Sequence, residues 1–264
     1  MSTPPAPRPV ALVTGASAGI GVELARLLAA DHDLVLTARR TEQLQALATE
    51  LEKRGAKCHV FPADLARADA PRKLFDAIES AGLRIDVLVN NAGFGDLGPF
   101  AQADQAKLLR MIQLNVAALT ELTGLYLPGF VARSAGRILN VGSIAGFQGG
   151  PYMAVYYATK AYVNSFSEAL HTELRGTGVT VTVLCPGPVA TEFAAVSGMH
   201  VTRVFSAGQA MGAGPVALAG LRAMRAGTRM VVPGWRNRLM LFLARLMPRG
   251  TVLGAVRWMM SKRL

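Results

Sequence analysis

Short apolar runs alternate along the chain with longer segments whose apolar residues recur at helical spacing. The first run, VALVT at 10–14, is followed by a segment in which Leu24, Ala25 and Leu28 fall on one helical face. The pattern predicts strands over 10–14, 33–38, 57–64, 85–93, 136–143, 179–187 and 229–234, and helices over 22–30, 41–55, 72–82, 104–127 and 155–176. Apolar strands separated by helices are typical of a parallel sheet buried on both faces. We therefore expect an α/β protein with a doubly wound, seven-stranded parallel sheet and helices on both faces.

The composition fits one large domain. The chain has 264 residues and a mass of 27.9 kDa, and it is 51% hydrophobic and 17% charged, which is ample for a core. Its start, MSTPPAPRP, has no apolar core segment, so neither a signal peptide nor an anchor is expected. Cys58 and Cys185 lie far apart and are poor candidates for a disulfide framework, so a reducing cytoplasm is the expected compartment.

The net charge of +11 belongs to the last third of the chain. Up to Glu192, 17 Lys and Arg residues balance 17 Asp and Glu residues, whereas 193–264 holds 11 basic residues and no acidic one. A nucleic-acid-binding fold would need positive charge across its main face, and no nucleic-acid motif is present. We expect no nucleic-acid partner.

Glycines gather where the first predicted strand meets the first helix. The stretch TGASAGIG places Gly15, Gly19 and Gly21 there, with Ser17, Ala18 and Ile20 between them. Glycines let the backbone approach a pyrophosphate, and the helix N-terminus offers free N–H groups to the anion. The spacing G-x3-G-x-G departs from the commoner G-x-G-x-x-G, so a purely structural turn is the alternative. We expect a dinucleotide to bind at this turn.

The end of the second predicted strand indicates which dinucleotide it is. NAD enzymes usually carry an acidic residue there, which binds the ribose 2′-hydroxyl, whereas this chain has Arg39 and Arg40 and no carboxylate nearby. A guanidinium suits a phosphate dianion through forked hydrogen bonds. The pattern favours NADP(H) over NAD(H). The alternative is a pair of solvated arginines, which is more plausible for Arg40 than for Arg39.

Four of the five tyrosines fall within GGPYMAVYYATKAY, residues 149–162, around one lysine. Tyr156 and Lys160 are four residues apart on a predicted helix and so share a face. A free phenol has a pKa near 10, and an ammonium ~5–6 Å away at an effective dielectric of ~20 favours phenolate by ~3 kcal/mol, or about two pKa units. The side chain of Tyr157, the competitor, points about 100° around the helix. The pair predicts a tyrosine that works as a general acid or base near neutral pH.

Five blocks in order give the chain a family likeness over about residues 8–234. They are TGASAGIG, the Asp64-Leu65 pair, NNAG at 90–93, Ser143 with Tyr156-x-x-x-Lys160, and PGPVAT at 186–191. Together they resemble the compact, classical branch of the short-chain dehydrogenase/reductase family. The resemblance implies a Rossmann-type catalytic domain over 8–234 and, as is common in that family, a homodimer or homotetramer.

The resemblance also implies a role for each matching residue. Tyr156 would donate a proton to a carbonyl oxygen, Lys160 would lower the pKa of that tyrosine and bind the nicotinamide ribose, and Ser143 would hydrogen-bond the substrate oxygen. Asn115 would bend its helix and support a water relay to the lysine. The remaining cofactor contacts would be Asp64, Leu65, Asn91, Ala92, Gly93, Pro186, Gly187, Val189 and Thr191, with Asn90 mainly a scaffold residue. Tyr152 would line the substrate pocket, Tyr162 would pack or lie at a subunit interface, and residues 193–213 would form a mobile substrate loop.

These expectations describe an NADPH-dependent enzyme that interconverts an apolar ketone or aldehyde and its alcohol. The alternative is a non-catalytic NADP-binding scaffold or membrane-surface protein, although the complete Ser, Tyr, Lys and Asn set argues against it. No metal is expected, because the four histidines and two cysteines have no ligand spacing. Ser143 lacks the GxSxG pattern of a nucleophile elbow.

The last thirty residues, 235–264, form a basic, apolar extension. Their apolar runs are no longer than six residues, too short for a transmembrane helix. If helical, the segment places Arg238, Arg245 and Arg249 on one face opposite a wide apolar one, with a break at Pro248 and Gly250. Three interpretations stay open: a helix lying on a membrane surface, a lid or subunit interface, and a site for an acidic partner.

Overall fold

The computed structural model of the chain describes residues 8–199, 202 and 210–261. The sheet has seven parallel strands in the order β3-β2-β1-β4-β5-β6-β7. The strands are β1 (Val10–Thr14), β2 (Asp33–Thr37), β3 (Cys58–Val60), β4 (Ile85–Asn90), β5 (Gly136–Val141), β6 (Val179–Leu184) and β7 (Met230–Val231). The predicted single-domain, doubly wound, seven-stranded fold is confirmed.

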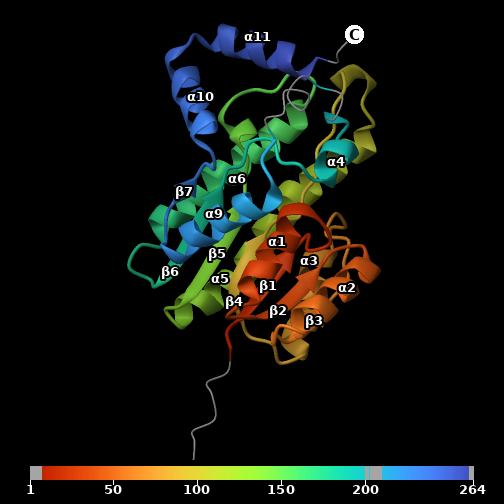
Figure 1. Cartoon of the computed structure of the whole chain (residues 1–264), viewed down its shortest axis with the longest axis vertical. Coiled ribbons are helices and arrows are strands. Elements are labelled where there is room, and N and C mark those ends of the chain that lie inside the picture. The colour runs from red at the N-terminus through yellow and green to blue at the C-terminus, as the bar shows by residue number, and fades with distance from the viewer. Residues whose placement is uncertain (1–7, 200–201, 203–209, 262–264) are drawn as a thin grey trace, which may run out of the picture.

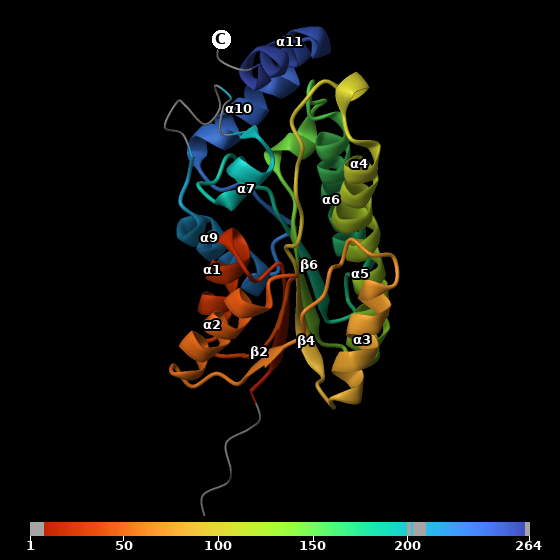
Figure 2. The same ribbon diagram turned by 90° about the vertical axis from the view of Figure 1, so that its right-hand side faces the viewer.

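Helices cover both faces of the sheet. They are α1 (Gly19–Leu28), α2 (Thr41–Glu52), α3 (Ala70–Ser80), α4 (Gln105–Ile112), α5 (Leu119–Ala132), α6 (Ala154–Glu173), α7 (Glu192–Val196), α9 (Ala213–Arg225), α10 (Trp235–Leu246) and α11 (Arg249–Met260). Figure 2 shows α1, α2 and α9 on one side and α3, α4, α5 and α6 on the other, with α10 and α11 above the sheet. Because all strands are parallel, their carboxyl ends form one edge, and β1 and β4 meet at the point where the chain reverses its winding.

Two apolar clusters, one on each face, hold these layers together. On one face Leu24 and Leu28 of α1 pack with Val216 and Leu221 of α9. On the other face side chains of α3 and α5, among them Ile78 and Phe130, pack on the sheet. The side chains are fully or almost fully buried, which explains why the strands appear in the sequence as unbroken apolar runs.

A buried polar network joins the sheet to the helices on the second of these faces. Asn90 at the end of β4 donates to Thr123 Oγ1 at 3.1 Å and to Asn140 Oδ1 at 3.0 Å, and Asn140 donates to Ser167 Oγ at 2.9 Å. These bonds tie β4 and β5 to α5 and α6, because each side chain comes from a different element. Asn90 therefore supports the scaffold, as its position in the sequence predicted.

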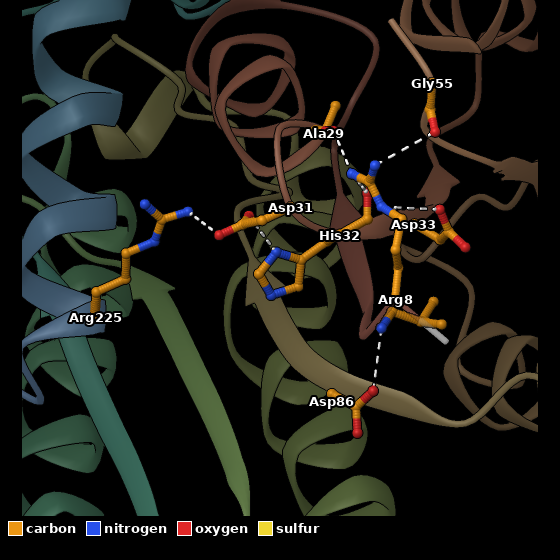
Figure 3. A network of polar contacts seen from close by, with 9 residues as sticks. Arg8, Ala29, Asp31, His32, Asp33, Gly55, Asp86 and Arg225 are labelled. Atoms are coloured by element: carbon orange, nitrogen blue, oxygen red, sulfur yellow. Dashed lines mark hydrogen bonds and ion pairs between the residues drawn. The ribbon is translucent and has the colours of Figure 1, made fainter. Parts of the chain in front are cut away.

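A second network fastens the opposite end of the sheet (Figure 3). Arg8 donates to the carbonyls of Ala29 at 2.6 Å and His32 at 3.0 Å and pairs with Asp33 at 3.4 Å. Asp31 bridges the ring of His32 and Arg225 of α9, at 2.6 Å in both cases. The network joins the start of β1, the α1–β2 turn and the end of α9.

The helix predicted over 104–127 is interrupted in the structure. It consists of α4, a π-helical turn over Gln113–Ala118 (η2), and α5, which continues to Ala132. The whole stretch Gln105–Ala132 is long and apolar enough to cross a membrane by length and composition alone, and its α5 part packs against the sheet. The helix α9 was not predicted. Of the substrate loop predicted over 193–213, the part at 200–201 and 203–209 lies outside the described residues.

The described part of the C-terminal extension forms two helices above the sheet, and α11 runs across the top at a wide angle to α10 (Figure 1). Its helices α10 and α11 meet at Met247 and Pro248, so the predicted break is present. The prediction that Arg249 shares a helical face with Arg238 and Arg245 is wrong, because Arg249 begins the second helix.

Candidate active site

Four predicted catalytic residues come together at the carboxyl edge. Ser143 follows β5, Tyr156 and Lys160 lie on α6, and Asn115 lies in the π-helical turn. All four side chains are buried, with exposed fractions between 2% and 8%. Three separate elements therefore supply one buried polar cluster.

Asn115 fastens the loop after β4 to α6. Its Oδ1 accepts from the Phe94 N–H at 3.1 Å, and its Nδ2 donates to the Phe94 carbonyl at 2.9 Å and to Thr159 Oγ1 at 3.1 Å. A π-helical turn frees backbone groups from the regular ladder and often marks a functional site. The expected helix distortion at Asn115 is present. A water relay stays a prediction.

Lys160 points under the tyrosine ring toward the sheet. Its Nζ donates to the Val141 carbonyl at 2.7 Å and lies 5.9 Å from the centroid of the Tyr156 ring. The same nitrogen is 3.7 Å from the place that a Cβ on Gly93 would occupy. The predicted juxtaposition of Tyr156 and Lys160 on one face of a helix is present.

The protein atoms shift the two pKa values differently from the expectation based on the sequence. Burial raises the pKa of Tyr156 to about 12, against a smaller lowering by the Ser143 hydroxyl. Burial also lowers the pKa of Lys160 to about 8. Removal from water therefore dominates the pKa shift of Tyr156 in the protein alone, and the lowering of that pKa by Lys160 stays a prediction.

Ser143 stands between the tyrosine and the loop after β6. Its hydroxyl accepts from the Ala145 N–H at 3.0 Å and donates to the Pro186 carbonyl at 3.5 Å. It is also the hydrogen-bonding neighbour that opposes the upward pKa shift of Tyr156. The hydroxyls of Ser143 and Tyr156 are therefore neighbours within the buried cluster.

The other tyrosines have separate surroundings. Tyr157 is buried, its ring fills the place of a Cβ on Gly150 at 2.2 Å, and burial raises the pKa of its phenol. Tyr152 has a φ of 67°, and its hydroxyl accepts from Arg257 Nε of α11 at 3.4 Å. Tyr162 is on the outer side of α6, hydrogen-bonded to Thr120 at 2.9 Å and stacked on Phe166. Tyr156 is the one that meets both Ser143 and Lys160.

The turn after β1 has the shape of a dinucleotide cradle. Gly15 and Gly19 have φ values of 67° and 58°, which favour glycine. A Cβ on Gly21 would lie 2.3 Å from the Gly15 carbonyl oxygen, so only glycine fits. Ala18 precedes α1 without a side-chain cap, and Ile20 lies in the first turn. Free N–H groups at the start of α1 suit a phosphate.

The NNAG block supports this cradle from the neighbouring strand. Asn91 Nδ2 donates to the carbonyls of Thr14 at 2.9 Å and Gly15 at 3.2 Å, while the N–H groups of Asn91 and Ala92 donate to Thr14 Oγ1. A Cβ on Gly93 would lie 3.0 Å from Asn115 Oδ1. The block thus joins the cradle to the catalytic cluster.

The two arginines after β2 differ in their engagement. Arg40 donates to the Ser17 carbonyl at 3.1 Å and pairs with Glu192 of α7 at 2.9 Å. Arg39 is exposed and, among the residues that the structure describes, makes no ion pair. Arg39 is available to an incoming phosphate, whereas Arg40 braces the glycine-rich turn.

Asp64 and Leu65 also differ. The Asp64 carboxylate accepts from the Ala66 N–H at 3.2 Å and pairs with Arg110 of α4 at 3.0 Å. Leu65 is buried in the core beneath it. The backbone of this pair lies after β3 at the edge where the cofactor is expected, and the Leu65 side chain serves the core.

The PGPVAT loop meets both the cradle and the extension. Pro186 accepts from the Ile144 N–H at 3.0 Å, Val189 forms a β-bridge with Met211, and a Cβ on Gly19 would lie 3.0 Å from Thr191 Cγ2. A Cβ on Gly187 would lie 2.7 Å from the amide of Asn237 in α10. The extension therefore touches the loop expected beside the nicotinamide.

An apolar cluster surrounds Tyr156 and is closed by α11. Val256 and Met260 of α11 are buried against it, with exposed fractions of 2% and 5%. The other buried members are Leu108, Met111, Ala145, Met153, Tyr157 and Met199. Sequence reasoning missed these two positions of α11. Their four-residue spacing indicated a shared helical face, but nothing in the sequence showed that this face would turn inward.

The fold and the site together define a class: a doubly wound α/β oxidoreductase built to hold a dinucleotide beside a buried tyrosine. Residues 9–200 match the family model described as short chain dehydrogenase. The chain belongs to the short-chain dehydrogenase/reductase family, which confirms the resemblance found in its motifs.

Relatives and solved structures agree with this assignment. The chain is 41% identical over 192 residues to an NADP-dependent 3-hydroxy acid dehydrogenase of Salmonella typhi, covering 71% of this chain and 75% of that protein. It matches a short-chain dehydrogenase from Sphingobium yanoikuyae in complex with NADPH at 32% identity and a TM-score of 0.80, covering 97% and 96% of the two chains. It matches a bulky-bulky ketone specific alcohol dehydrogenase from Comamonas testosteroni at 29% identity and a TM-score of 0.75, covering 90% and 92%. The chain spans 63% to 75% of the length of the curated relatives it matches.

Proposed function

We propose that this protein is an NADPH-dependent reductase of apolar ketones or aldehydes that also oxidises the corresponding alcohols. The observation that carries this proposal is the apolar cluster around Tyr156, closed by α11. Leu108, Met111, Met153 and Met199 of this cluster are buried beside Tyr156, so it suits a substrate whose carbonyl is flanked by hydrocarbon. The similarity to an alcohol dehydrogenase specific for bulky ketones supports the same substrate class.

NADP(H) is the cofactor that the residues fit. The glycine cradle would hold its pyrophosphate, and exposed Arg39 would pair with the 2′-phosphate. Asp64, Ala92 and Gly93 lie along the edge where the adenosine would bind, and Val189 and Thr191 lie in the loop expected at the nicotinamide. When bound, NADPH supplies the hydride. The NADPH complex of one structural neighbour and the NADP dependence of one relative support this choice.

The chain's own residues supply the proton and hold the substrate oxygen. The Ser143 hydroxyl donates a hydrogen bond to the carbonyl oxygen and orients it toward Tyr156. The Tyr156 phenol then gives its proton to that oxygen as the carbonyl carbon is reduced. Lys160, fixed on the Val141 carbonyl, keeps a positive charge beneath the ring that stabilises the phenolate left behind. Asn115 is a positioning residue, because it holds the Phe94 backbone and α6 together.

The pKa of Tyr156 favours reduction near neutral pH. Burial raises it to about 12, so the phenol carries its proton through the whole physiological range. A general acid must be protonated before it acts, and the Tyr156 phenol is protonated at neutral pH. Oxidation of an alcohol needs the phenolate and should require a higher pH.

The test compares Tyr156→Phe with Tyr157→Phe, two adjacent buried tyrosines of which Tyr156 has the Ser143 hydroxyl as a hydrogen-bonding neighbour. We expect Tyr156→Phe to lower kcat for an aryl alkyl ketone by ~10²-fold or more. Tyr157→Phe should stay near wild type, and both variants should bind NADPH normally. Equal turnover by the two variants would refute the mechanism, and normal NADPH binding without reduction of any ketone by the wild type would favour the scaffold alternative.

A second candidate substrate is a carbonyl compound that bears a carboxylate. Arg257 of α11 reaches Tyr152 beside the pocket, and one relative is named for 3-hydroxy acids. Arg257→Met separates the two candidates. A rise in KM for a carboxylated ketone, with no change for its methyl ester, would favour the acid.

The assembly and location that we propose follow the family and the surface. The outer sides of α4 and α6 expose Leu109, Ile112 and Tyr162, which suits a homodimer or homotetramer formed through these helices. We place the protein in the cytoplasm, with its catalytic domain at 8–234 and its extension at 235–264 acting as a lid over the pocket. Light scattering on purified protein measures the assembly, and a monomer would contradict it.

A further inference from the structure

One face of α10 is apolar and lies open to solvent. Trp235, Leu239, Phe242, Leu243 and Leu246 have exposed fractions between 47% and 70%, and no residue of α10 is buried. We call these five residues the α10 stripe. Single exposed apolar residues are ordinary, but a contiguous group of this kind marks an interaction surface.

The helix geometry gives the stripe charged borders. At 100° per residue the five side chains span an arc of about 100°. On the same scale Arg236 lies at one border of the arc, and Arg238 and Arg245 lie at the other. The opposite side of the helix faces the body of the protein, where Asn237 meets Gly187.

The arginines at these borders are exposed to solvent, and the Nε of Arg238 donates to the Val232 carbonyl at 2.9 Å. Within the described part of the chain none of the three forms an ion pair, and Arg236 rests over the Trp235 ring at 5.5 Å. The nearest neighbours along the sequence offer no carboxylate, because 193–264 holds no acidic residue. An occupant of the stripe must therefore supply apolar groups at its centre and negative charge at both of its borders.

We propose that the α10 stripe docks on an anionic phospholipid surface, with α10 lying in the plane of the interface. Acyl chains would cover the leucines and Phe242, while the arginine side chains reach the phosphates on either side. A second copy paired stripe to stripe would instead bring like-charged arginines together around a twofold axis. If the proposed function holds, α10 and α11 would keep the apolar cluster around Tyr156 near the lipid, a source of apolar substrate.

The experiment uses purified full-length protein and sedimented vesicles. One set contains phosphatidylcholine mixed with phosphatidylglycerol, and the other contains phosphatidylcholine alone. Phe242→Asp tests the centre of the stripe, and Val131→Asp places the same charge on an exposed apolar residue at the end of α5. Arg245→Gln tests a border, and Arg137→Gln, exposed at the start of β5, is its control.

We expect wild type to bind the anionic vesicles and to dissociate as salt is raised. Phe242→Asp should weaken binding by about tenfold or more, and Arg245→Gln by about fivefold, with both controls unchanged. Failure of wild type to bind, or equal binding by Phe242→Asp and Val131→Asp, would overturn the proposal. Light scattering on the same samples tests whether the stripe instead contacts a second copy of the chain. The lipid proposal would be overturned if Phe242→Asp lost its oligomers while wild type did not bind vesicles.

Discussion

Replacing Arg39 by alanine should convert an NADPH-selective protein into one that barely distinguishes NADPH from NADH. Arg39 is exposed at the end of β2 and, within the described chain, has no ion pair to break before it binds a phosphate. The free energy of its hydrogen bonds to a phosphate would therefore not be reduced by the loss of an existing ion pair. Hydrogen bonds to charged groups contribute ~1.5–3 kcal/mol each, so even one of them corresponds to about a tenfold to 150-fold change in Kd.

Arg40→Ala provides the contrast, because this side chain already has partners. It holds the Ser17 carbonyl and Glu192, and the exposed ion pair contributes only ~0–1 kcal/mol. Loss of this side chain should loosen the glycine-rich turn and weaken the binding of NADPH and of NADH to a similar degree. Fluorescence titration of wild type and both variants with each cofactor measures this. The assignment is refuted if Arg39→Ala keeps its preference for NADPH while Arg40→Ala loses it.

Three further outcomes are expected from the site and its supports. Burial lowers the pKa of Lys160 to about 8, so its ammonium is present below that pH. The rate of ketone reduction should therefore fall as the pH rises through about 8. Lys160→Arg should abolish this fall in the pH–rate profile. Gly21→Ala would place a methyl group 2.3 Å from the Gly15 carbonyl oxygen and should destroy NADPH binding. Gly124 on α5 has open space around it, so Gly124→Ala should raise the free energy of unfolding, measured in urea, by up to ~1 kcal/mol. Asn115→Ala leaves the partly buried N–H and carbonyl of Phe94 without their side-chain partner and should lower the free energy of unfolding by ~1–3 kcal/mol. A loss below ~0.5 kcal/mol would contradict the network described for it.

The sheet could be predicted because burial on both faces leaves a simple trace in the sequence. Each strand of the core is a run of apolar residues, and each run is followed by glycine or a polar residue at the edge that binds ligands. The helix α9 was missed, although Val216, Ala217, Leu221 and Met224 recur at helical spacing and are buried. Glycines and a proline at the start of α9 obscured this pattern, because helix starts tolerate proline while sequence patterns count it as a break.

The site could be predicted in position but not in electrostatics. Fixed spacing on one helix placed Tyr156 against Lys160, and order along the sheet placed Ser143 beside them. The sign of the tyrosine pKa shift depends on how completely the phenol is removed from water and on where the ammonium points. Both are tertiary properties, set by α11 above the cluster and by the Val141 carbonyl below it. Spacing alone therefore indicated that the two side chains are neighbours but not that burial would raise the pKa of Tyr156.

The extension shows why amphipathic character alone does not identify a partner. Its two helices have similar compositions, but the break at Pro248 lets them turn their apolar faces in different directions. Val256 and Met260 of α11 face inward over Tyr156, whereas Phe242 and Leu246 of α10 face solvent. A single uninterrupted helix of this length could not both pack against the cluster around Tyr156 and present a separate apolar face to solvent in a different direction. The proline thus separates one apolar segment into a helix that packs over Tyr156 and a helix whose apolar face stays open to solvent.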